Sequence, residues 1–318
     1  MLFTRRDVGK IALGAGTAAA LSAAKPNSKF GGVQIGVITY SFRALPGSAE
    51  QILGYVVDCG INGIELMGYT AERYAGSPAP PRRRGGGRVR LTPEERRKAA
   101  EEVKQWRLSV SMDKYRAFRK MYEDAGVKIY AFKLPPTMAM SDPEYEYIWN
   151  VAETLGANHI TMELPTDDSL LRRVADYAAK RKLRIAFHTH GQGGSSGFDN
   201  ALAASEYTAL NLDVGHYFGV TGESPVPLVK KYHDRIASLH LKDRKGPNSA
   251  AEHRGPRGGG PNMPWGQGGT PLIEILQLMK KQHYKFPASI EYEYKTPPGS
   301  DVLTEVKKCL EYCKKALA

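Results

Sequence analysis

Charged and histidine side chains recur at the ends of short apolar segments throughout this chain. A charged group at the inner end of a buried strand is costly unless it is paired or bound to a metal ion. One such residue is explained by an interior salt bridge, but recurrence at the ends of seven segments favours a shared site. Carboxylates and imidazoles together suit Mn²⁺, Zn²⁺, Co²⁺ or Mg²⁺. The residues are Glu65, Lys133, Glu163, His188, His190, Asp213, His216, His240, Lys242, Asp243, Glu291 and Glu293.

Three of these residues, Asp213, His240 and Glu291, form the centre of a metal-site hypothesis. They lie 27 and 51 residues apart. Each interval fits an advance of one strand in a strand–helix repeat, if the second interval also contains a glycine-rich insertion. We therefore predict that all three bind one divalent metal ion. Structural ion pairing is the alternative that the spacing leaves open.

The elements that must position these residues alternate between β-prone and helical segments from residue 33 onward. Eight strands, each followed by a helix, predict parallel pairing and a closed (β/α)₈ TIM barrel. A chain of 318 residues accommodates one such barrel, which we place at residues 31–318 as a single α/β domain. The predicted strands are 33–40, 60–66, 127–134, 159–164, 184–190, 210–214, 236–242 and 288–294.

The helical segments between these strands carry start signals and amphipathic spacing. Thr92 as N-cap, Pro93 at the first helical position and Glu95 in the first turn begin one helix, at 92–106. Apolar residues recur at helical spacing in the others. These are 48–59, 170–180, 271–281 and 303–316.

Two insertions interrupt the repeat. Residues 76–91 are rich in Pro, Gly and Arg, and residues 243–270 contain seven glycines between Gly255 and Gly269. Both follow strands, so we expect them on the carboxyl-terminal face of the barrel, where barrel enzymes place their sites. Substrate lids and decorations without function both remain open.

Composition bounds the class of protein. The chain is 42% hydrophobic and 25% charged, as is usual for a globular protein. Three cysteines do not form a disulfide framework. The net charge of +12 would suit an anionic partner, but much of it is local and typical of a solvated loop. That local charge is carried by Arg82, Arg83, Arg84, Arg88 and Arg90.

The first thirty residues have the layout of an export leader. The twin arginines Arg5 and Arg6 precede an apolar run at 11–20 and small residues at 21–24, as in a twin-arginine (Tat) signal peptide. The run is too short for a stable membrane span. We therefore predict a signal peptide and linker at 1–30, and a periplasmic or secreted protein. This route exports folded proteins that already hold their cofactor, which is consistent with a metalloenzyme.

Four segments together resemble the xylose isomerase-like TIM barrel superfamily, which includes the sugar phosphate isomerases/epimerases. They are 211–216 (NLDVGH), 238–244 (SLHLKDR), 264–268 (PWGQG) and 289–291 (SIE). The resemblance extends over essentially everything after Gly31. It implies that Asp213, His240 and Glu291 bind the metal and that His216 contacts the substrate.

The fourth ligand is where the sequence departs from this family. A Glu-Asn-His-Gly-like motif on the fifth strand normally supplies it, whereas this chain has His188-Thr189-His190-Gly191. We favour Glu163 on the neighbouring strand as the ligand and His188 as an acid/base group. Two alternatives stay open: His188 itself binds the metal, or Glu163 acts as an ion-pairing partner behind the ligands.

The function that this resemblance implies is a divalent-metal-dependent sugar isomerase or epimerase. A proton next to a carbonyl is abstracted and an enediolate forms, with Glu291 and His188 as catalytic groups. We expect a small carbohydrate or polyol substrate and no nucleic acid partner. The remaining expected substrate-binding residues are His190, Lys133, Lys242 and Trp265.

Other functions stay open with different weight. Because His188 replaces one of two glutamates used by epimerases of the superfamily, a lyase or hydratase on keto-sugars, keto-glycosides or inososes is the main alternative. An abasic-site endonuclease needs extra histidines where this chain has Glu65 and Lys133. A sugar-binding barrel without catalysis would not need the metal ligands.

Overall fold

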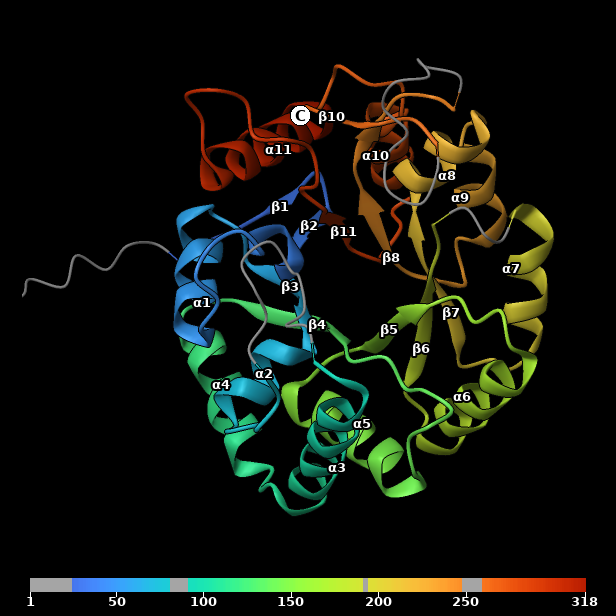
Figure 1. The fold of residues 1–318 in the computed structure, drawn as a ribbon. Helices are drawn as coiled ribbons and strands as arrows, with labels where there is room; N and C mark the ends of the chain where they lie inside the picture. The colour runs from blue at the N-terminus through green and yellow to red at the C-terminus, as the bar shows by residue number, and fades with distance from the viewer. Residues whose placement is uncertain (1–24, 81–90, 191–193, 248–258) are drawn as a thin grey trace, which may run out of the picture.

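Eight parallel strands form a closed barrel in this computed structural model, which describes residues 25–80, 91–190, 194–247 and 259–318 (Figure 1). The barrel closes because the last strand pairs with the first, and the first with the second. The predicted TIM barrel fold is therefore confirmed. In chain order, its strands are β2 (Val33–Ile38), β3 (Gly63–Met67), β4 (Lys128–Lys133), β5 (His159–Glu163), β6 (Arg184–His188), β7 (Thr208–Asp213), β8 (Ile236–Leu241) and β11 (Ala288–Ile290).

The strands are buried on both faces, because side chains fill the barrel and helices cover its outside. All six residues of β7 are buried, for example. The strand register sets the site, since it pairs Glu163 with His188 and Asp213 with His240 across neighbouring strands. The ends of β5 to β8 thus bring their polar residues to one end of the barrel.

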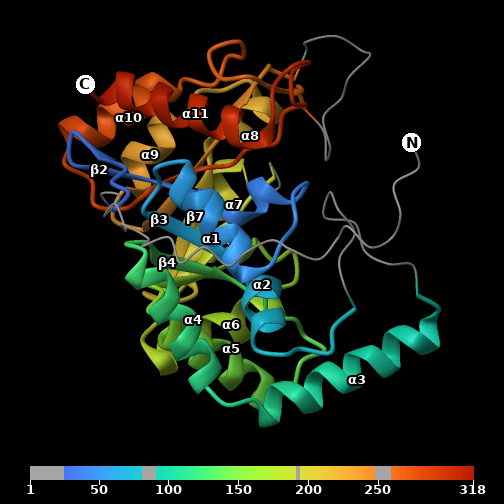
Figure 2. The ribbon, with the colours of Figure 1, turned by 90° about the vertical axis from the view of Figure 1, so that its left-hand side faces the viewer.

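Helices surround the barrel on all sides (Figures 1 and 2). One of them, α3 (Pro93–Ser109), points away from the rest and has no buried residue (Figure 2). The helices are α1 (Ala49–Asp58), α2 (Gly68–Tyr74), α3 (Pro93–Ser109), α4 (Asp113–Asp124), α5 (Asp142–Leu155), α6 (Asp168–Arg181), α7 (Gly194–Ala203), α8 (Val214–Thr221), α9 (Val226–Tyr232), α10 (Leu272–Lys281) and α11 (Val302–Leu317), with a 3₁₀ turn η1 (Thr39–Phe42).

The local sequence signals agree with these elements in most places. The N-cap predicted at Thr92 is confirmed, with its hydroxyl accepting from the backbone N–H of Glu95, and the Glu95 carboxylate accepts in return from the backbone N–H of Thr92. The last barrel strand is shorter than predicted, because β11 ends at Ile290, although the backbone N–H of Glu291 still donates to Leu241. Three two-residue strands, β1 (Lys29–Phe30), β9 (Asp243–Arg244) and β10 (Asn262–Met263), were not predicted.

Several sequence predictions lie wholly or largely outside the described residues. They concern the export leader, the arginine-rich stretch at 82–90 and the middle of the glycine-rich insertion. Within the described part of the chain, no helix has both the length and the apolar character that a membrane crossing requires.

Candidate active site and metal centre

Four buried residues meet at the carboxyl-terminal end of the barrel: His188, Asp213, His240 and Glu291. Each offers a nitrogen or oxygen atom, and these atoms all lie within 4.8 Å of one another. They come from the ends of β6, β7, β8 and β11. The structure therefore brings together the three residues that spacing singled out, and it adds His188.

His240 lies between two carboxylates. Its Nδ1 is 2.7 Å from Oε2 of Glu291, and its Nε2 is 2.7 Å from Oε2 of Glu65. Burial alone would lower the pKa of His240, but the two carboxylates raise it to about 10. Burial would likewise raise the pKa of Glu65, yet the charge of His240 lowers it to about 2. The two carboxylates thus strongly favour the positively charged form of the His240 ring.

The ammonium of Lys242 faces the same carboxylates. Its Nζ lies 3.0 Å from Oδ2 of Asp213, 2.9 Å from Oε2 of Glu291 and 2.7 Å from Oε2 of Glu293. Burial would lower the pKa of this lysine, but the carboxylates raise it well above its ordinary value. The pKa of Asp213 is raised to about 6, because burial outweighs the attraction of Lys242.

The hydrogen bonds of Asn211 determine which nitrogen of His188 carries the proton. The Asn211 amide nitrogen donates to Glu65, at 3.0 Å, and to Ser238, at 2.6 Å. The amide oxygen of Asn211 therefore accepts from Nδ1 of His188, at 2.9 Å. Burial keeps the pKa of His188 well below its ordinary value, so the ring is neutral. Its Nε2 then carries a lone pair and lies 3.8 Å from Oδ2 of Asp213.

This donor set fits a divalent ion. Two carboxylates, one imidazole with a lone pair and a second imidazole form a mixed nitrogen–oxygen site of the kind that Mn²⁺, Zn²⁺ or Co²⁺ prefers. Oδ2 of Asp213 faces Lys242 in an ion pair at 3.0 Å and accepts no hydrogen bond among the described residues, so it can also serve as a ligand. The carboxylates that raise the pKa of His240 favour a cation at this position, and a metal ion would replace the proton on Nδ1 and take over that charge.

Glu163, which the sequence favoured as the fourth ligand, is outside this group of four. Its side chain is 42% exposed, with Oε2 at 2.6 Å from Nδ1 of His190 and Oε1 at 3.5 Å from Nζ of Lys133. The geometry favours His188 as the fourth metal ligand instead. The reason is the register, which places the end of β5 beside β6, two strands away from Asp213.

His190 and His216, both expected to contact substrate, lie next to the group. Their ring centroids are 4.4 Å apart, and His190 is 4.7 Å from His188. The backbone N–H of His216 donates to Oδ1 of Asp213, because Asp213 is the N-cap of α8. Burial, together with the nearby charge of Lys242, lowers the pKa of His216 well below its ordinary value.

Three further residues, Glu65, Asn211 and Arg244, contact the site residues directly, and the sequence predicted no role for them. The sequence does single out Glu65 as unusual, since it is a charged residue on a buried strand. Asn211 and Arg244 carried none of their own, because their role depends on contacts between distant strands.

Trp265 lies in the carboxyl-terminal part of the glycine-rich insertion at 243–270. The carboxylate of Asp243 accepts from the backbone N–H groups of Gly266, Gly268 and Thr270, and so holds this loop. The indole of Trp265 packs edge-on against Tyr312 of α11, with ring centroids 5.7 Å apart. Stacking of Trp265 on a substrate stays a prediction.

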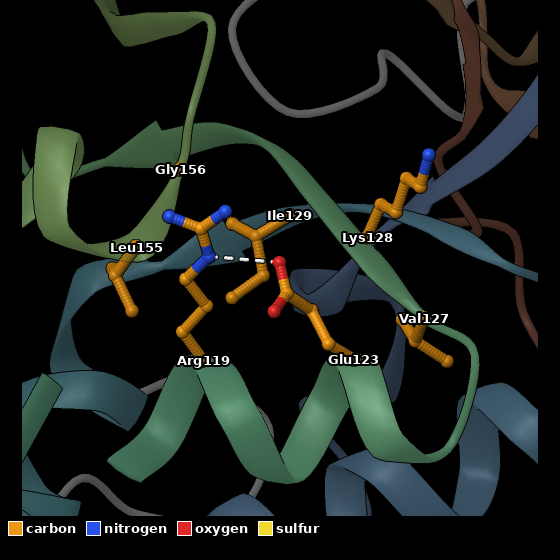
Figure 3. Close-up of a pocket in the computed structure, with 7 residues that line it drawn as sticks. All are labelled: Arg119, Glu123, Val127, Lys128, Ile129, Leu155 and Gly156. Carbon is orange, nitrogen blue, oxygen red and sulfur yellow. Dashed lines mark hydrogen bonds and ion pairs between the residues drawn. The ribbon is translucent and has the colours of Figure 1, made fainter. Parts of the chain in front are cut away.

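A hollow of about 210 Å³ lies at the opposite end of the barrel (Figure 3). It is lined by Arg119, Glu123, Val127, Lys128, Ile129, Leu155 and Gly156. Arg119 donates to Glu123 at 2.8 Å along one wall of the hollow, since both residues lie on α4 (Figure 3). Because the hollow lies where β4 begins, it is separate from the site at the strands' carboxyl ends.

Comparison with known proteins points to one class of barrel. The sequence profile of the "Xylose isomerase-like TIM barrel" family matches residues 169–314, which include all four residues of the group. The inosose dehydratase of Clostridium botulinum (strain Eklund 17B / Type B) is 29% identical over 135 residues, 39% of this chain and 45% of that protein. The inosose dehydratase of Lacticaseibacillus casei is 28% identical over 89 residues, 26% of this chain and 30% of that protein. The chain thus matches less than half the length of these relatives.

Solved structures share the fold over nearly the whole barrel. The probable 3-DHS dehydratase of Bacillus anthracis has a TM-score of 0.60 at 16% identity, covering 87% of this chain and 97% of that one. The 3-keto-D-glucoside 4-epimerase of E. coli has a TM-score of 0.56 at 11% identity, covering 89% and 99%. At these identities the likeness shows the fold alone.

Proposed function

We propose that this protein is a divalent-metal-dependent enzyme of the xylose isomerase-like class that removes the proton next to the carbonyl of a keto-polyol. The observation that carries this proposal is the buried group of His188, Asp213, His240 and Glu291 at the end of the barrel that holds barrel active sites. When bound, a divalent ion supplies a Lewis acid that polarises a carbonyl oxygen.

Glu291 is the base in this proposal. Burial would raise the pKa of Glu291, but Lys242 and His240 hold it well below its ordinary value, so the group is a carboxylate at neutral pH. The one lone pair of the His188 ring, on Nε2, serves the metal ion in this proposal, so Glu291 is the single base that we assign and His188 is a ligand rather than the acid/base group expected from the sequence. In this proposal Lys242 and Glu293, which pair at 2.7 Å, orient hydroxyl groups of the substrate.

Among the reactions that begin with this step, we favour elimination of water. The β carbon–oxygen bond then breaks, a carbon–carbon double bond forms, and the leaving hydroxyl takes a proton to become water. Support comes from the inosose dehydratases among the relatives. The resemblance to the superfamily adds that His188 stands where its epimerases carry their second glutamate. Epimerisation is the second candidate, because it begins with the same proton abstraction by Glu291 and a 3-keto-D-glucoside 4-epimerase shares this fold.

The test is turnover of inososes, ketoses and keto-glycosides by full-length protein loaded with Mn²⁺, Co²⁺ or Zn²⁺ in D₂O. Elimination yields an unsaturated ketone with ultraviolet absorbance, whereas epimerisation yields a carbon-bound deuteron without loss of water. We expect Glu291→Gln to abolish turnover, while Glu311→Gln on the outer face of α11 does not change it. Wild-type rates in Glu291→Gln, or no turnover with any metal and substrate, would contradict the proposal.

A further inference from the structure

Arg244 is wholly buried, and its guanidinium points at a histidine of the candidate site. One terminal nitrogen, Nη1, lies 2.7 Å from Nδ1 of His216. Nε and Nη2 both donate to the carbonyl oxygen of Gly260, at 2.9 Å and 2.6 Å. The guanidinium is therefore held in one orientation by contacts on two sides.

The chemistry of this contact settles where the proton of His216 lies. A guanidinium only donates hydrogen bonds, so Nδ1 of His216 must accept and must carry a lone pair. The ring is then neutral, and its single N–H is on Nε2. That nitrogen faces the site, at 3.9 Å from both Oδ2 of Asp213 and Oε2 of Glu293.

Building on the proposed function, we propose that Arg244 is a positioning residue that makes His216 a hydrogen-bond donor to a substrate oxygen. The neighbouring His188 has the opposite polarity, because Asn211 accepts from its Nδ1 and leaves a lone pair on Nε2. The two rings, 6.0 Å apart, therefore present a lone pair for the metal ion on His188 and an N–H donor on His216 to the same space. A neutral imidazole donor polarises a substrate carbonyl or steadies the oxyanion that forms from it.

The same contact excludes a second metal site. The ring nitrogens of His188, His190 and His216 lie close enough together to share an ion. However, the nitrogen that His216 turns toward the site carries a proton and has no lone pair to offer. We therefore assign His190 and His216 to binding of substrate oxygen, and a single metal ion to the group of His188, Asp213, His240 and Glu291.

The fold makes room for this arginine at a glycine. A methyl group on Gly219 would lie 2.7 Å from Nε and 2.8 Å from Cζ of Arg244, closer than atoms pack. Gly219 and His216 are three residues apart on α8, so they share a face of the helix. The helix that carries the histidine thus also leaves the space in which its partner lies.

The test is the tautomer of His216, read from imidazole ¹⁵N chemical shifts in metal-free full-length protein, with His216→Gln used for assignment. We expect protonated Nε2 and unprotonated Nδ1 in the wild type. Arg244→Met and Gly219→Ala should raise the Nδ1-protonated population, whereas Arg244→Gln, whose amide still donates, should restore the wild-type tautomer. Arg235→Met is the matched control, since Arg235 donates to three backbone carbonyls away from the site.

Activity provides the second readout. We expect kcat to fall about 10- to 100-fold in Arg244→Met with a smaller change in KM, because the donor acts mainly on developing charge. A protonated Nδ1 in the wild type, or an unchanged tautomer in both Arg244→Met and Gly219→Ala, would overturn the inference. The tautomer measurement needs no substrate, so absence of turnover with the expected tautomer would overturn the proposed function and leave the assignment of Arg244 intact.

Discussion

Nε2 of His240 lies 2.7 Å from Oε2 of Glu65, and both side chains are wholly buried inside the barrel. A carboxylate behind a metal-binding histidine orients the ring and increases its basicity. We therefore predict that Glu65→Gln lowers Mn²⁺ affinity about tenfold and Glu65→Leu up to about 100-fold, as measured by calorimetry. Glu144→Gln, at a buried carboxylate of α5, should leave the affinity unchanged. Equal affinity in all four proteins would contradict a metal at His240.

The fourth ligand can be identified by comparing two variants. His188 lies in the group of four, whereas Glu163 pairs with His190 and Lys133 outside it. His188→Ala should therefore weaken Mn²⁺ binding by at least about tenfold, and Glu163→Gln should change it much less. Competition with a metal-sensitive dye gives both constants. A larger loss of Mn²⁺ affinity in Glu163→Gln than in His188→Ala would identify Glu163 as the ligand.

Lys242 supplies positive charge to three carboxylates, two of which are proposed metal ligands. Lys242→Met leaves those buried charges without their lysine partner, so metal-free protein should lose about 3–5 kcal/mol of unfolding free energy. Added Mn²⁺ should recover most of this loss, because the ion supplies the missing charge. Thermal unfolding with EDTA and with Mn²⁺ measures both effects.

The control for this lysine is Lys307→Met, at an exposed pair with Asp58 on the outside of the barrel. Exposed pairs contribute little, so its melting temperature should not depend on the metal. If Mn²⁺ changes the melting temperatures of Lys242→Met and Lys307→Met by the same amount, then Lys242 does not balance the carboxylate charge of the metal site.

The free energy of unfolding should decrease as the pH falls, because His159 is buried in its neutral form. Burial lowers the pKa of His159 from 6.5 to about 4, so between these values the unfolded chain binds a proton that the folded protein does not. The contribution is present above pH 6.5 and is lost as pH falls toward 4, by about 3 kcal/mol in total. Urea unfolding of metal-free protein at pH 7, 6 and 5 should show a shallower pH dependence in His159→Gln. The exposed His283→Asn should follow the wild type.

The leader prediction can be tested in cells. Replacing Arg5 and Arg6 with lysine should block export through the twin-arginine route, so the protein should accumulate in the cytoplasmic fraction. Lys10→Arg, in the same segment, should leave the distribution unchanged. Equal fractionation of all three proteins would refute the leader.

The order and type of the elements followed from local patterns. Alternating β-prone and helical segments, and caps such as Thr92, predict a barrel because they depend only on residues near in sequence. Spacing also singled out Asp213, His240 and Glu291, since each lies near the end of a successive strand. The sequence by itself therefore determined the fold class and three corners of the candidate site.

The fourth corner and the roles of the histidines depended on the tertiary structure. The register between strands places His188 in the group and Glu163 outside it. Asn211 and Arg244 give His188 and His216 opposite polarity, through side-chain contacts spanning 23 and 28 residues. Local patterns do not encode such contacts, because a tautomer is set by whichever donor or acceptor the folded barrel places beside the ring.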